Sequence, residues 1–154
     1  GQAVVFLRRL AAPLDAAHRT GRAHGSLSPE CVLVGGDDSV VLEDFGVAAA
    51  LASAGVRAPG SPAYAAPELE TAPPGPAADL YSLGVLLYEL VTGRHPFDGT
   101  NLRAMKLEKR YAPLSRSAPG CPPALEALVD GLLEPDPAHR RPTPGGLEAA
   151  LRAL

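Results

Sequence analysis

The residues best suited to chemistry are concentrated between positions 24 and 31 of this chain. His24, Ser26, Ser28 and Cys31 bring an imidazole, two hydroxyls and a thiol into one short stretch. Hydroxyls and thiols become nucleophiles when a base lies beside them, but no recognisable spacing places a base next to Ser26 or Cys31. We therefore expect no nucleophilic catalysis from either residue, and we expect His24 to be a packed core histidine.

Asp44 offers a carboxylate for one of two roles. It could hold Mg²⁺, a cation that prefers oxygen ligands, or it could cap a turn beside Gly46. Cys31 and Cys121 are the only cysteines, and they form neither a disulfide framework nor a metal-binding cluster. A reducing compartment is the default for such a chain, so we expect a cytoplasmic protein.

The elements that must position these residues are mostly helical. Apolar side chains at helical spacing predict a helix over residues 2–20, kinked or restarted at Pro13, and a strong helix over 77–92 that ends at Gly93. A short β-hairpin is predicted where two β-branched runs flank Gly35-Gly36-Asp37-Asp38. The remaining expectations are a long loop over 46–63 and shorter helices over 101–109, 123–133 and 146–153.

Composition and charge limit the classes of function. With 46% hydrophobic and 20% charged residues, the chain is globular rather than disordered. A net charge of -3 argues against a nucleic-acid partner held by a basic surface. No segment is long and apolar enough to span a bilayer. The 154 residues correspond to one domain or part of one, and because the first residue is Gly1 rather than Met, we expect a piece of a longer protein.

Several motifs follow one another in an order typical of one family. His24-Gly25-Ser26-Leu27-Ser28-Pro29-Glu30-Cys31 precedes Asp44-Phe45-Gly46, which precedes Ala66-Pro67-Glu68, Asp79-Leu80-Tyr81-Ser82-Leu83-Gly84 and Arg140-Arg141-Pro142. This order resembles the C-terminal lobe of a bacterial-type serine/threonine protein kinase from about residue 3 to the end. The resemblance implies a protein-kinase-like fold, a mostly α-helical C-lobe with a short β-hairpin, with residues 1–154 as part of one kinase-like domain. The family's glycine-rich phosphate loop and the lysine strand of its N-lobe have no counterpart in this sequence.

The structural positions of the family are matched. The resemblance implies that His24 stacks on Phe45 in the regulatory hydrophobic column, and that Asp79 anchors the backbone near His24. It also implies that Glu68 pairs with Arg141, because a buried carboxylate needs a fixed cation.

The nucleotide side of the family's site is matched only in part. The resemblance places Leu33 under the adenine ring, supported by Leu86 and Leu90, and leaves Asp44 as the one retained metal-binding residue. No cofactor is firmly implied, although ATP and Mg²⁺ remain open for the full-length protein.

The chemical positions of the family are not matched. In its catalytic loop an Asp accepts the proton of the substrate hydroxyl, a Lys steadies the transferred phosphate and an Asn holds Mg²⁺. Ser26, Ser28 and Cys31 occupy these three positions, and Gly25 replaces the Arg that reads a phosphorylated activation loop. A neutral hydroxyl cannot replace a carboxylate as proton acceptor, and a thiol is a poor ligand for Mg²⁺.

The sequence therefore predicts a catalytically inactive pseudokinase that acts as a regulatory or protein-binding scaffold. Its expected partners are proteins, such as an active kinase or a signalling protein, and the segment 101–109 corresponds to the family's docking surface. Two alternatives stay open: a fragment of an active ATP-dependent serine/threonine protein kinase, and a truncated relic without selected function.

Overall fold

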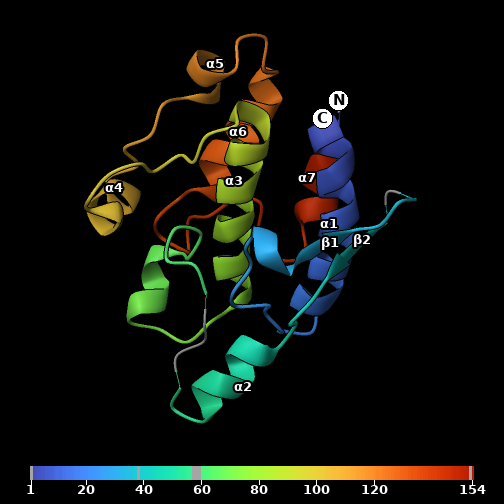
Figure 1. Cartoon of the computed structure of the whole chain (residues 1–154), viewed down its shortest axis with the longest axis vertical. Helices are drawn as coiled ribbons and strands as arrows, with labels where there is room; N and C mark the ends of the chain where they lie inside the picture. Colours follow the sequence, from blue (N-terminus) through green and yellow to red (C-terminus); the bar gives the residue numbers. More distant parts are fainter. Residues whose placement is uncertain (1, 38, 57–59, 153) are drawn as a thin grey trace.

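The computed structural model describes residues 2–37, 39–56, 60–152 and 154. The chain is mostly helical, with one two-stranded antiparallel sheet among the described residues, as the sequence predicts. Figure 1 shows its elements, which are α1 (Gln2–His18), the 3₁₀ turn η1 (Pro29–Cys31), β1 (Val32–Val34), β2 (Val40–Leu42), α2 (Val47–Ser53), the 3₁₀ turn η2 (Pro67–Glu70), α3 (Pro76–Thr92), α4 (Leu102–Leu107), α5 (Leu114–Ser117), α6 (Pro123–Leu132) and α7 (Leu147–Arg152).

Helix α3 forms the centre of the core. Pro76 lies in its first turn, where a missing N–H costs nothing, and Gly93 ends it in the left-handed conformation. The helix runs through the middle of the molecule and packs on α6 and α1 (Figure 1). The approach to α6 is close, because a Cβ on Gly84 would lie 2.8 Å from the Cβ of Leu132. Helix α3 is therefore the platform from which the surrounding loops are held.

Helix α1 packs on α3 and on the C-terminal helix α7. It continues through Pro13 as one element, so the restart that the sequence suggested there is wrong. Leu10, Ala11 and Leu14 on either side of Pro13 are fully buried, so packing offsets the lost hydrogen bond. The buried carboxylate of Asp15 accepts the N–H groups of Leu147 and Glu148 and thereby caps α7.

The hairpin β1–β2 lies between the turn η1 and the segment that contains Asp44. Its register pairs Val32 with Leu42 and Leu33 with Val41. β2 lies against α1, as Figure 1 shows beside the N-terminal helix.

One stretch differs from the sequence-based expectation. Residues 46–63 were expected to form a long loop, but α2 occupies Val47–Ser53 within it, and residues 57–59 lie outside the described part of the chain. The helix Val-Ala-Ala-Ala-Leu-Ala-Ser is rich in alanine, which has the highest helix propensity, so weighing Ala with Gly and Pro as a loop signal was wrong. The short helix α5 was also missed.

Candidate functional site

The loop of residues 24–31, here called the 24–31 loop, is held from below by one buried carboxylate. Asp79 lies in the first turn of α3 and is 1% exposed. Its Oδ2 accepts the His24 N–H at 2.7 Å, and its Oδ1 accepts the Gly25 N–H at 2.8 Å. The ring Nε2 of His18 lies 2.9 Å from the same carboxylate. Hydrogen bonds to a carboxylate are stronger than neutral ones, so Asp79 fixes the start of the loop on the helical core.

His24 is a packed residue rather than an accessible base. Its ring is fully buried, donates from Nε2 to the Glu43 carbonyl oxygen at 2.7 Å, and meets Phe45 edge to face at 5.3 Å between centroids. Burial by itself would lower the pKa of His24, but the neighbouring Cys31 thiol and the Glu43 carbonyl raise it overall. The ring thus links the loop to the segment that contains Asp44.

Cys31 is bound back onto its own loop. Its Sγ–H donates to the Ser28 carbonyl oxygen at 3.0 Å, and its Sγ accepts the Ser28 N–H at 3.3 Å. Burial raises the pKa of the Cys31 thiol, but the hydrogen bond and charge attraction of His24 and the hydrogen bond to the Ser28 backbone together lower it more, so the pKa lies below its ordinary value. Ser26 is half-buried, and its N–H points to the Nδ1 of His24. The 24–31 loop therefore presents two hydroxyls and a thiol at positions 26, 28 and 31.

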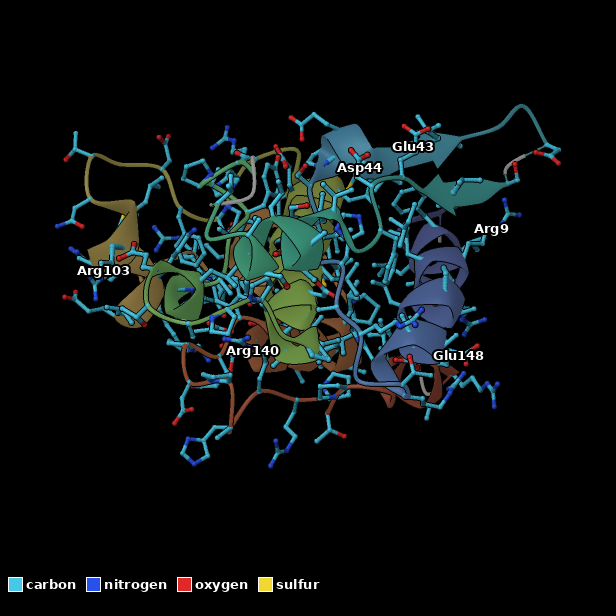
Figure 2. The ribbon with its side chains drawn as sticks, turned by 90° about the horizontal axis from the view of Figure 1, so that it is seen from below. Arg9, Glu43, Asp44, Arg103, Arg140 and Glu148 are labelled. Carbon is cyan, nitrogen blue, oxygen red and sulfur yellow. The ribbon has the colours of Figure 1, made fainter. Side chains whose placement is uncertain are left out.

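Asp44 offers a single exposed carboxylate. Its backbone is left-handed, with φ at 59°, a conformation that Asp tolerates better than most residues. Figure 2 shows Asp44 and Glu43 together beside the hairpin, away from Arg140. No group of three or more His, Cys, Asp or Glu residues in the described part of the chain could hold a metal ion. Mg²⁺ is usually bound by one or two carboxylates together with substrate phosphates and water, and Asp44 offers one such carboxylate.

Of the three leucines expected near a nucleotide, Leu86 and Leu90 lie on α3 and Leu33 lies on β1. Leu86 and Leu90 line a cavity of about 460 Å³ together with Val32 and Val34. Leu33 points to the other face of the strand and is 46% exposed. Successive side chains of a strand alternate between faces, so Leu33 is not in contact with this cavity. Any support from Leu86 and Leu90 reaches Leu33 only through the strand.

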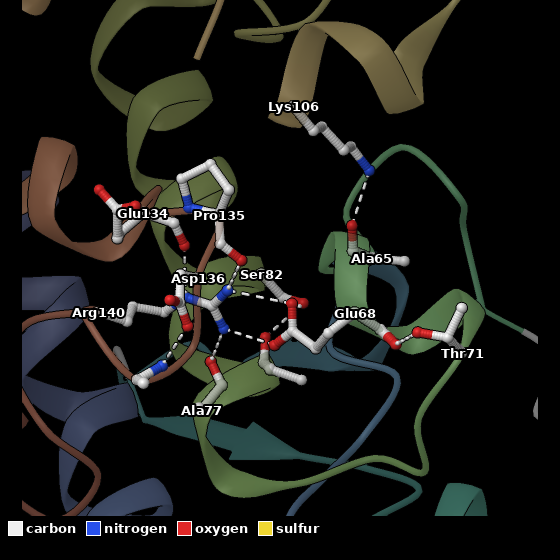
Figure 3. Close-up of polar contacts among 12 residues, drawn as sticks. Ala65, Glu68, Thr71, Ala77, Ser82, Lys106, Glu134, Pro135, Asp136 and Arg140 are labelled. Atoms are coloured by element: carbon white, nitrogen blue, oxygen red, sulfur yellow. Dashed lines mark hydrogen bonds and ion pairs between the residues drawn. The ribbon is translucent and has the colours of Figure 1, made fainter. Parts of the chain in front are cut away.

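A buried ion pair ties η2 to the C-terminal loops, but with a different arginine from the one expected. Arg140, not Arg141, binds Glu68, with Nη1–Oε1 at 2.6 Å and Nη2–Oε2 at 3.0 Å (Figure 3). Arg140 is 1% exposed, whereas Arg141 is exposed and its side chain donates to the nearby carbonyls of Ala138 and Arg140. Consecutive residues point in different directions, and the motif alone does not say which of the two faces the core.

Lys106 is a second buried cation, which the sequence analysis missed. Its Nζ donates to the carbonyl oxygens of Pro62 and Ala65 at 2.6 and 2.7 Å, and Figure 3 draws the bond to Ala65. Burial lowers its pKa to about 8. A single lysine in a short helix gives no sequence signal for such a role. Lys106 clamps the segment before η2 onto α4.

Tyr64 and Glu89 form a further contact that sequence reasoning did not find. The Tyr64 hydroxyl donates to the Glu89 carboxylate, and burial together with this bond raises the pKa of Tyr64. Glu89 lies on α3, so this bond fixes the same segment from a second side.

The fold and these anchors agree with comparisons with known proteins. Residues 1–151 match the protein kinase domain. The chain therefore belongs to the protein kinase domain family, and its fold is that of the family's helical lobe with one short hairpin.

Relatives of the bacterial serine/threonine type are similar along almost the whole chain. Serine/threonine-protein kinase PknL of Mycobacterium tuberculosis is 35% identical over 98% of this chain and 40% of its own length. PknE of Mycobacterium tuberculosis and PknJ of Mycobacterium bovis are each 34% identical over 99% of this chain and 28% of their own length. The chain thus spans less than half of the relatives it matches. Within the described residues, no helix is of the length and apolar character that a membrane crossing requires.

Proposed function

We propose that this chain is the helical lobe of a pseudokinase, a kinase-like domain that binds protein partners and does not transfer phosphate. The observation that carries the proposal is the set of side chains in the 24–31 loop. Ser26, Ser28 and Cys31 stand at the family's proton-accepting, phosphate-steadying and metal-binding positions, and the Cys31 thiol is occupied by the Ser28 backbone.

These replacements are expected to lower the rate of phosphate transfer by more than Asp44 alone can restore. Removing one preorganised electrostatic group lowers a rate by about 10²–10³. The three losses are not additive, but all lower the rate. Asp44 is the remaining carboxylate of the family's metal-binding set, and Cys31, at the other metal-binding position, offers a thiol in place of the oxygen donor that Mg²⁺ prefers.

The anchors of the scaffold, in contrast, are complete. Asp79 holds the 24–31 loop, and the pair of Glu68 and Arg140 holds η2. A lobe built in this way offers stable surfaces to other proteins. Leu107 on α4 is 49% exposed, which supports α4 as part of such a surface.

Phosphotransfer itself tests the proposal. The intact protein is incubated with labelled ATP, Mg²⁺ and a generic protein substrate, beside the variant Asp44→Ala. We expect no transfer above background in either. Transfer by the wild type that Asp44→Ala abolishes would refute the pseudokinase proposal.

An active enzyme is the second candidate. It is favoured by the 34–35% identity to proteins named serine/threonine-protein kinases. Thermal-shift titration of the intact protein with ATP, with and without Mg²⁺, separates the two. ATP at 100 times its dissociation constant raises the free energy of unfolding by about 2.7 kcal/mol. A rise in melting temperature that depends on Mg²⁺ favours the active enzyme.

A further inference from the structure

Helix α7 is held at both ends by side chains of one neighbouring helix, α1. At its N-terminus the buried carboxylate of Asp15 accepts the N–H groups of Leu147 and Glu148 at 3.3 and 2.8 Å. At its C-terminus the guanidinium of Arg8 donates to the Leu151 carbonyl oxygen, through Nε at 3.3 Å and Nη2 at 3.1 Å. These are end groups that a helix leaves without partners of its own. Helix α1 therefore caps α7 at both ends.

The spacing of the two capping residues matches the length of α7. Arg8 and Asp15 are seven residues apart on α1, which places them on one face and about 10 Å apart along the axis. The six residues of α7 span about 9 Å. Leu147 and Leu151 lie between the two caps and are fully buried where α7 packs on α1. This face of α1 therefore fits one short helix in both length and polarity.

Helix α7 depends on this docking for its stability. Isolated helices shorter than about 12–15 residues are marginal in water, and α7 has six. Figure 1 shows α7 beside α1, on the side of the molecule away from α4 and α5. Gly145 and Gly146 precede the helix, and Gly145 has φ at +82°. Because glycine adopts positive and negative φ with similar ease, this connection can serve as a hinge.

We propose that this face of α1 is an exchangeable docking site, which the α7 helix of a second copy of the chain occupies to form a dimer in which two copies trade α7. The occupant fits by identity, because α7 of another copy brings the same end groups to Arg8 and Asp15 and the same two leucines. Exchange of an identical element across a hinge is a low-cost route to dimers. The inference is independent of the proposed function, since phosphate transfer would leave these contacts unchanged.

Strain placed in the hinge tests the exchange. In the closed monomer Gly145→Ala puts a side chain at a positive φ, with its Cβ 3.3 Å from the Cγ of Arg19. An opened hinge relieves this strain in both copies, so we expect the association constant to rise at least about ten-fold in sedimentation velocity of the intact protein. Gly120→Ala is the matched control. Its φ is +89° with open space around it, but it lies between α5 and α6, so its strain is the same in monomer and dimer.

Hydrogen exchange distinguishes the traded helix from non-specific association. In the proposed dimer the α7 amides stay as protected as in the wild type, because every copy of α7 is docked. A dimer whose α7 amides exchange rapidly would overturn the proposal, and so would a Gly145→Ala variant that stays monomeric with α3 protected. If exchange in α3 also becomes faster, the lobe has loosened and the wild type decides.

The wild-type measurement is refolding from urea at high and at low protein concentration. We expect a dimer fraction after refolding at high concentration and monomer at low concentration, because docking to another copy depends on concentration. Leu151→Asp cannot dock its α7 on either copy and should give no dimer, whereas Ala149→Asp, on the exposed face of α7, should behave as the wild type. Wild-type protein that refolds to monomer alone, or equal dimer in the two aspartate variants, would overturn the proposal.

Discussion

The pair of Glu68 and Arg140 allows a quantitative test of how the lobe is held together. A guanidinium has five N–H donors, and all five of Arg140 have acceptors. Nε donates to Glu134, Nη1 to Glu68 and Ala77, and Nη2 to Glu68 and Pro135. Arg140→Ala removes these five bonds together and leaves a partly buried carboxylate without its cation.

The expected cost follows from this geometry. Removing one partner of a buried ion pair destabilises by about 3–5 kcal/mol, because the remaining charge is uncompensated. The Glu68 side chain keeps 17% exposure, so water compensates part of its charge. The three orphaned carbonyls act in the opposite direction, since each unsatisfied buried acceptor adds to the cost. We expect Arg140→Ala to lower the free energy of unfolding by about 3–4 kcal/mol.

The adjacent arginine is the matched control. Arg141 is exposed and its side chain bonds nearby carbonyls, so Arg141→Ala should change the free energy of unfolding by less than about 0.5 kcal/mol. Arg140→Lys keeps the charge but loses the two-pronged contact, and we expect a loss of about 2 kcal/mol. Urea unfolding of the intact protein, followed by circular dichroism, measures all three. A loss for Arg141→Ala as large as that for Arg140→Ala would refute the assignment of the pair.

Three further perturbations test other contacts. Gly84→Ala places a Cβ 2.8 Å from Leu132 and should cost about 1–3 kcal/mol in urea unfolding, whereas Gly75→Ala, where a Cβ meets nothing within 4 Å, should cost less. Lys106 has a folded pKa of about 8 against 10.5 for the ordinary side chain, so between these pH values the unfolded chain binds a proton that the folded chain has released. Stability of the wild type should therefore rise with pH across this window relative to Lys106→Met, and parallel pH profiles would contradict the lowered pKa. Asp79→Asn removes the charge that binds two loop N–H groups and should lower the unfolding free energy by about 2–3 kcal/mol in urea titrations; an unchanged midpoint would show that the loop holds itself.

The sequence predicts the elements that local chemistry determines. The leucine spacing and Gly93 define α3, and the Gly-Gly-Asp-Asp turn defines the hairpin, because both signals act within a few residues. The sequence analysis did not predict helix α2. Its alanines are compatible both with a loop rich in small residues and with a short helix that needs packing to be stable. Its one buried residue, Ala48, packs beside Gly25, which is distant in sequence.

For the site, the motifs predict which positions matter but not where the side chains at those positions point. The motifs identify the positions of Asp79 and Glu68, since their order in the chain is specific. Motif order could not distinguish Arg140 from Arg141, nor place Leu33 on a face away from Leu86, because these choices depend on where side chains point after the chain has packed. Lys106 left no signal, because its acceptors are backbone carbonyls, which every sequence contains.

Asp79 and Arg140 are needed for the stability of the fold, whereas the residue at position 26 is not. Asp79 and Arg140 are almost fully buried and satisfy groups that would otherwise be unpaired, so the fold needs them whether or not phosphate is transferred. Their presence therefore says little about activity. Ser26 bears no such burden, because its side chain faces a cavity and binds no anchor of the core. A carboxylate at this position would serve catalysis and not the fold, so the proposed inactivity rests on Ser26 and not on the scaffold residues. The replaced residues, not the retained ones, are thus the informative part of this site.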